Sequence, residues 1–80
     1  MSNDQLSILR AEIDTLDEEL IRTLALRFIA TGKIGVIKAT RCLEAVDPSR
    51  EAEQMRRYSL LALRHGVSIE VIQKVFRAII

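Results

Sequence analysis

The chain has 80 residues, with twelve Lys and Arg against eleven Asp and Glu, one Cys, one His and no Trp. A net charge of +1, two Phe and one Tyr argue against nucleic-acid binding, which needs a basic patch and stacking side chains. No apolar run approaches the ~20 residues of a membrane span, and the N-terminus lacks a signal-peptide pattern. The length predicts one domain over residues 1–80. The single cysteine favours a cytoplasmic location, and one Cys with one His argues against structural zinc.

Apolar residues of the first segment recur every three or four positions, as on one face of a helix. They are Leu6, Leu9, Ile13, Leu16, Leu20 and Leu24. The same stripe, here called the seam, continues in register with Arg27, Thr31, Ile34 and Lys38. An apolar stripe therefore turns cationic halfway along. A capping cluster at residues 2–4 predicts the helix start, and we extend the helix from Asp4 through Gly32 and Gly35 to about Thr40.

Two shorter helices follow a loop that we expect at residues 42–46. Asp47 and Pro48 predict a helix start, since an acidic cap precedes a proline at the first helical position. This second helix is expected to end near His65, with Gly66 as its stop. Ser68 predicts the cap of a third helix, whose apolar face is Ile72, Val75, Phe76 and Ile79. It reaches Ile80 without a stop signal, so we expect it to continue. The predicted fold class is all-α, with three helices per chain and a long first helix.

The length of the first helix predicts a dimer. A helix from Asp4 to Thr40 is ~55 Å long, whereas a compact domain of this size is only ~30 Å across. The apolar half of the seam would overhang such a domain, and a second copy packed antiparallel would bury it. The alternative is a bend at residues 32–35 that folds a monomeric bundle.

The cationic residues of the first helix suggest a site for a small anion. Arg27 and Lys38 are eleven residues apart, which places them on one face at ~16 Å. Arg10 lies ~25 Å from Arg27 and about 100° around the helix, so it can reach only the Arg27 of an antiparallel partner. Arg50 and Glu51, in the first turn of the second helix, add a cation and a carboxylate.

Simpler interpretations remain open for each of these residues. Charged side chains on a helix are usually solvated, Glu51 could form a structural ion pair, and Asp47 is at least a cap. The chain has no Ser/His/Asp arrangement and no glycine-rich phosphate loop, and Cys42 has no clear activating neighbour. Such a site could hold and polarise a ligand, but it is poorly equipped for nucleophilic or metal chemistry.

Several short motifs together resemble the all-helical chorismate mutase family. In chain order they are Leu9-Arg10-Ala11-Glu12-Ile13-Asp14, Leu16-Asp17, Leu20-Ile21, Arg27, Lys38, Asp47-Pro48-Ser49-Arg50-Glu51, Val75-Phe76 and Ile79-Ile80. The resemblance implies an intertwined homodimer of three-helix chains with two equivalent active sites. It also implies conversion of chorismate to prephenate, by a [3,3] rearrangement without cofactor or metal, in phenylalanine and tyrosine biosynthesis.

The resemblance also implies roles for the matching cations. Arg27 matches the arginine that binds one substrate carboxylate, and Arg10 matches the arginine that the other subunit supplies for the second carboxylate. Lys38 matches the lysine that donates to the ether oxygen, where negative charge grows as the C–O bond breaks.

The remaining matches surround the rest of the substrate. Glu51 matches the carboxylate that accepts a hydrogen bond from the ring hydroxyl, and Asp47 matches a position that helps to bind that hydroxyl. Arg50 lies at the motif position of a substrate-binding arginine, while Ile34 and Ile80 match apolar pocket walls. The serine and glutamine that complete the family's pocket would follow Ile80, so the third helix is cut short relative to the family.

Two other functions remain open. The same fold with similar cations can remove pyruvate from isochorismate, although the Asp-Pro-x-Arg-Glu pattern favours the mutase. A non-catalytic helical dimerisation or regulatory module is the other alternative, but such a bundle would not need Arg27 and Lys38 in its seam.

Overall fold

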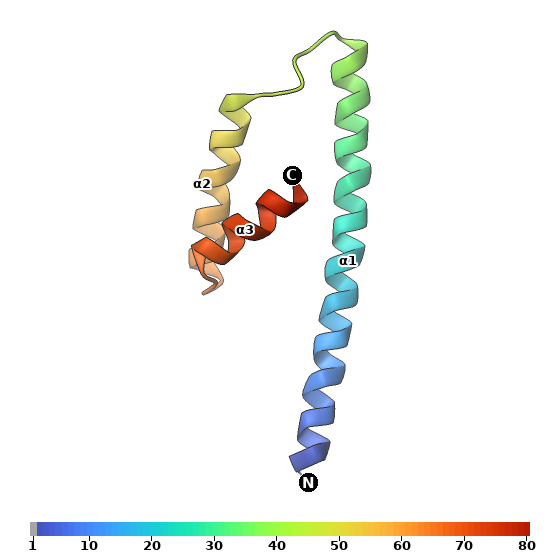
Figure 1. The fold of residues 1–80 in the computed structure, drawn as a ribbon, viewed down its shortest axis with the longest axis vertical. Coiled ribbons are helices and arrows are strands. Elements are labelled where there is room, and N and C mark those ends of the chain that lie inside the picture. The colour runs from blue at the N-terminus through green and yellow to red at the C-terminus, as the bar shows by residue number, and fades with distance from the viewer. Residues whose placement is uncertain (1) are drawn as a thin grey trace. The chain divides into compact units, whose positions relative to one another are not determined.

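The computed structural model contains three helices joined by loops: α1 (Ser2–Thr40), α2 (Pro48–Arg64) and α3 (Ile69–Ile79) (Figure 1). It describes residues 2–80, and side chains from Asp4 onward, so the predicted capping side chains at 2 and 3 lie outside the described part. Residues 2–80 contain no strand, which confirms the all-α fold class. No helix among them is both long and apolar enough to cross a membrane. The chain divides into two compact units, which meet between Leu43 and Glu44 in the sequence.

The first unit is built on α1, which is one uninterrupted helix (Figure 1). It begins two residues before the predicted Asp4, which lies in the first turn, and ends at Thr40 as predicted. The alternative of a bend at residues 32–35 is wrong. Gly32 and Gly35 each weaken a helix by only ~1 kcal/mol, and neither removes a backbone hydrogen bond as proline would.

The apolar part of the seam is exposed along α1. The five side chains from Leu6 to Leu20 keep between 45% and 61% of their surface accessible, and Leu24 is half-buried. A lone helix has no second element in its own unit to cover such a stripe. Helices in water owe most of their stability to packing of an apolar face. The seam therefore needs a cover from outside the first unit.

A hydrogen-bonded cap ends α1, and Cys42 adopts the left-handed conformation within it, with a φ of 55°. The amide of Leu43 donates to the carbonyl of Lys38 at 2.8 Å, and the amide of Cys42 donates to Ala39 at 3.3 Å. This pair of bonds is the Schellman motif. Glycine usually occupies the left-handed position, because a side chain there costs roughly 1–2 kcal/mol.

The second unit contains α2 and α3, and its helix ends confirm the predicted signals. The Asp47 carboxylate accepts a hydrogen bond from the amide of Arg50 at 3.1 Å, and Pro48 occupies the first helical position. The Ser68 hydroxyl accepts from the amide of Val71 at 3.3 Å, which caps α3. Gly66, with a φ of 67°, ends α2 in a second Schellman motif.

Packing between α2 and α3 centres on an aromatic pair. The rings of Tyr58 and Phe76 stack with centroids 3.8 Å apart and an angle of 14° between planes. Tyr58 and Ala62 are the buried apolar residues of the described chain, at 8% and 3% exposure. On the predicted α3 face, Ile72, Phe76 and Ile79 are half-buried. Val75 remains 42% exposed, because it lies at the edge of that face.

The two Schellman motifs predict opposite effects of substitution at the same structural position. Cys42→Gly should raise the free energy of unfolding by about 0.5–1 kcal/mol, because it relieves the left-handed side chain. Gly66→Ala should lower it by a similar amount, although open space surrounds the new methyl group. Urea denaturation at one fixed protein concentration, in reducing buffer, measures both changes. Shifts of the same sign would contradict this account of the caps.

Candidate functional site

The two predicted cations of the seam share one face of α1. No break interrupts the helix between Arg27 and Lys38, so the expected Cα separation of ~16 Å along one face stands. Both side chains are half-buried, whereas the other described charged residues of α1 are exposed. Lys38 lies in the last turn, where the helix dipole favours a cation.

Two seam residues lie between these cations. The Thr31 hydroxyl donates a hydrogen bond to the carbonyl of Phe28 at 3.1 Å, so this donor is already paired within α1. Ile34 is 50% exposed and presents an apolar surface. The seam between Arg27 and Lys38 is therefore an apolar strip with a cation at each end. Such a strip suits a small molecule that carries hydrogen-bond acceptors or anionic groups at its two ends.

Arg10 lies apart from both cations on the same helix. Seventeen residues of continuous helix place it ~25 Å from Arg27, and its side chain is exposed. No side chain can span that distance. Within one chain, Arg10 and Arg27 therefore cannot bind the same small anion.

The first turn of α2 holds the predicted acidic residues beside Arg50. One carboxylate oxygen of Asp47 caps the helix, which leaves its second oxygen without a partner among the described residues. The amide of Glu51 donates to the backbone carbonyl of Asp47 at 3.0 Å, and the Glu51 side chain is exposed. Two carboxylates thus lie at the positive end of a helix dipole, both able to accept a hydrogen bond.

An ion pair joins Arg50 to a residue that the sequence analysis did not single out. A guanidinium nitrogen of Arg50 lies 3.2 Å from Oε1 of Glu53, one turn further along α2, and both side chains are more than half exposed. The signal for this pair was the three-residue spacing of opposite charges. Arg50 keeps further N–H groups, because a guanidinium carries five donors.

Ile80 follows the end of α3. Its amide donates to the carbonyl of Phe76 at 2.9 Å, and its side chain is 70% exposed. The structure therefore brings the predicted site residues together in two groups. Arg27, Ile34 and Lys38 share a face of α1, and Asp47, Arg50 and Glu51 share the first turn of α2. Arg10 and Ile80 lie apart from these groups on their own elements.

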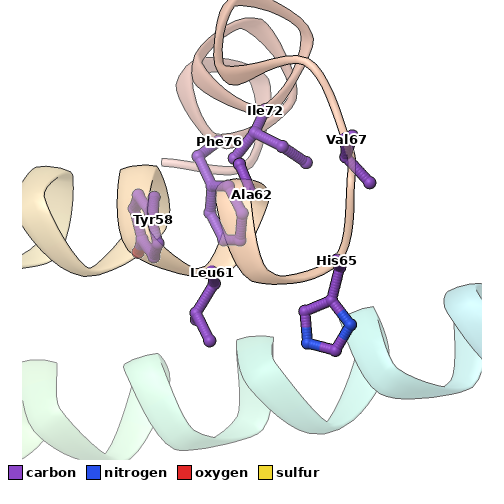
Figure 2. A pocket seen from close by; sticks show the side chains of 7 residues that line it. All are labelled: Tyr58, Leu61, Ala62, His65, Val67, Ile72 and Phe76. Carbon is purple, nitrogen blue, oxygen red and sulfur yellow. The ribbon is translucent and has the colours of Figure 1, made fainter.

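An apolar cavity between α2 and α3 was not predicted (Figure 2). It has a volume of about 170 Å³ and is lined by Tyr58, Leu61, Ala62, His65, Val67, Ile72 and Phe76. No carboxylate, lysine or arginine lines it, so it does not suit a dianion. The sequence signal for this cavity was an aromatic residue on the apolar face of both helices, Tyr58 on α2 and Phe76 on α3.

Comparison with known proteins assigns the chain to a family. The sequence profile of the family described as chorismate mutase type II matches residues 9–80, a range that holds every predicted site residue. The T-protein of Haemophilus influenzae is 35% identical over 74 residues. That match covers 92% of this chain but only 20% of the T-protein, so the chain spans about a fifth of that relative's length.

No solved structure matches the chain. The family profile nevertheless covers nearly all of it, including both groups of candidate site residues. The matched region is all-helical, as the resemblance implied. The chain therefore belongs to the chorismate mutase type II family, whose members are isomerases.

Proposed function

We propose that this chain converts chorismate to prephenate at two equivalent sites of a homodimer. The observation that carries the proposal is the cationic half of the seam. Arg27 and Lys38 share one face of an unbroken helix in a chain of this family. A helix that served only as packing would carry apolar residues there, because partly burying a charge costs free energy that an apolar side chain does not.

The homodimer explains both the exposed seam and the position of Arg10. The apolar side chains from Leu6 to Leu20 are about half exposed in one chain. An antiparallel second copy of α1 would cover them and release roughly 25 cal/mol for each Å² of apolar surface removed from water. The same antiparallel pairing brings Arg10 of the partner subunit toward Arg27, which one chain cannot do.

Two arginines suit the two carboxylates of chorismate. In this proposal Arg27 binds one carboxylate and Arg10 of the partner subunit binds the other. Each guanidinium can form two parallel hydrogen bonds to a carboxylate, which fixes direction as well as distance. Holding both carboxylates at set positions favours the compact diaxial form of the substrate, in which the reacting carbons meet.

Lys38 acts where charge develops. The rearrangement breaks the ether C–O bond and forms a C–C bond within the same molecule, so no proton needs to move. As the C–O bond lengthens, the ether oxygen gains negative charge, and the ammonium of Lys38 donates a hydrogen bond to it. A donor already in place stabilises this charge without reorganisation.

The first turn of α2 holds the ring. Glu51 accepts a hydrogen bond from the ring hydroxyl. Asp47 assists through its second carboxylate oxygen, the one that does not cap the helix. Arg50 adds a cation near the substrate carboxylates, while Ile34 and Ile80 form apolar walls against the ring. Pockets of this kind, apolar with a few fixed polar groups, orient small ligands. We place the reaction in the cytoplasm, in phenylalanine and tyrosine biosynthesis.

Removal of the ether-oxygen donor tests the mechanism. Lys38→Ala should lower kcat by about 10²–10³-fold, the usual cost of losing one such donor. Lys33→Ala is the matched control, since Lys33 lies on the same helix but off the seam, and it should retain turnover. The assay follows chorismate disappearance, and circular dichroism checks the helices. A Lys38→Ala chain as active as the Lys33→Ala chain would refute the assignment.

Subunit mixing tests whether the site is shared. Arg10→Ala and Arg27→Ala chains should each be nearly inactive alone. After exchange, half of the dimers carry one chain of each kind, and one of their two sites has both arginines. Mixing should therefore restore about a quarter of wild-type activity. Exchange is verified with differently tagged chains, and exchange without recovery would argue against a site formed by two subunits.

Substrate choice separates the mutase from the lyase that the sequence left open. Supplied with chorismate, the chain should form prephenate, and supplied with isochorismate it should form no salicylate. Chromatography of both reactions distinguishes the products. Salicylate formation at a comparable rate would favour the lyase, and inactivity on both would favour a dimerisation module.

A further inference from the structure

The side of α2 that faces away from α3 carries an unusual combination of residues. Tyr58 and Ala62 mark the buried side of α2. At 100° per residue, Leu60 and Leu63 lie on the opposite side of the helix. We call this surface the outer α2 face; its members are Arg56, Arg57, Leu60, Leu63 and Arg64.

The two leucines of the outer α2 face are strongly exposed. Leu60 is 67% and Leu63 is 74% accessible, and a three-residue spacing makes them neighbours on the helix surface. Beside Leu60, an open hollow of about 410 Å³ is lined by Met55, Arg56, Ser59 and Leu60. Single exposed leucines are common, but an adjacent pair next to a hollow forms an apolar patch that a partner can cover.

The charge around these leucines has one sign. The stretch from Gln54 to Arg64 contains three arginines and no Asp or Glu. Among the described residues, Arg56, Arg57 and Arg64 have no ion-pair partner, because the nearby Glu53 pairs with Arg50. An apolar pair with three unpaired arginines around it is complementary to a surface that carries both apolar side chains and carboxylates.

We propose that the outer α2 face binds an acidic amphipathic helix of another protein. Apolar anchors three residues apart match the spacing at which one helix docks against another. The arginines then meet the carboxylates that flank the apolar stripe of the partner, which fixes orientation and speeds association. None of these residues belongs to the proposed active site.

A membrane surface fits the outer α2 face less well. Basic helices that lie in a membrane bury a continuous apolar face along their length. Here the other side of α2 is occupied by α3, and only two leucines remain. Nucleic acid fits less well too, because no aromatic side chain lies among the arginines for a base to stack on.

A synthetic peptide provides the test. The probe is a labelled helix of about 18 residues made of Leu and Glu, with Leu at helical spacing. Fluorescence anisotropy at about 0.15 M salt should show binding to the full chain. A shuffled peptide of the same composition, with its leucines spread around the helix, should bind at least about ten-fold more weakly.

Matched variants locate the binding surface. Reversing Arg56, Arg57 and Arg64 to Glu, or changing Leu60 and Leu63 to Ser, should each weaken binding about ten-fold or more. Reversing the exposed Lys33, Lys74 and Arg77 to Glu controls for net charge and should weaken it much less. Circular dichroism and chorismate turnover verify that each variant folds.

Four outcomes would overturn the proposal. Equal binding of the ordered and shuffled peptides, or equal loss in both sets of charge reversals, would show general attraction to acidic chains. Binding to phosphatidylserine vesicles without peptide binding would indicate a membrane surface. Assembly beyond the α1 dimer in sedimentation that Leu63→Ser removes, without peptide binding, would indicate a further copy of this chain.

Discussion

The uncovered stripe of α1 is the constraint on which the rest of the structure depends. A helix of 39 residues is a unit without a core, and its first half exposes large apolar side chains along one line. Such a helix gains most of its stability from a surface that covers that line. The same line continues into Arg27 and Lys38, so any partner that follows it also encloses two cations. In the proposed homodimer, covering the helix and building the anion site are therefore one structural event.

Helix ends position the chemistry on the rest of the chain. Lys38 lies in the last turn of α1, and its carbonyl accepts the closing bond of the Schellman motif from Leu43. Asp47 caps α2, and Glu51 follows in its first turn. A hydrogen-bonded cap fixes the backbone on either side of the loop. The proposed donor to the ether oxygen and the acceptors for the ring hydroxyl thus rest on capped helix termini rather than on loop residues.

Local chemistry made much of this fold predictable from the sequence. Helix start and stop signals depend only on residues a few positions away in the sequence. The structure confirms the three that were predicted, at Asp47-Pro48, Gly66 and Ser68. The left-handed Cys42 was not predicted, because glycine is the usual marker of that position. The cavity beside Tyr58 was not predicted either, since it depends on how closely α3 packs against α2. Spacing alone placed Arg27 and Lys38 on one face, and the family resemblance supplied the roles proposed for them.

The periodicity of α2 lets one helix serve two purposes. Glu51 and Tyr58 are seven residues apart, almost two whole turns, so the proposed substrate contact shares the side that packs on α3. Leu60 and Leu63 occupy the opposite side, with arginines around them. A ligand on the outer α2 face would therefore not displace substrate directly. It could act on the active site only by moving α2 itself, and Asp47, Arg50 and Glu51 would move with the helix because they form its cap and first turn.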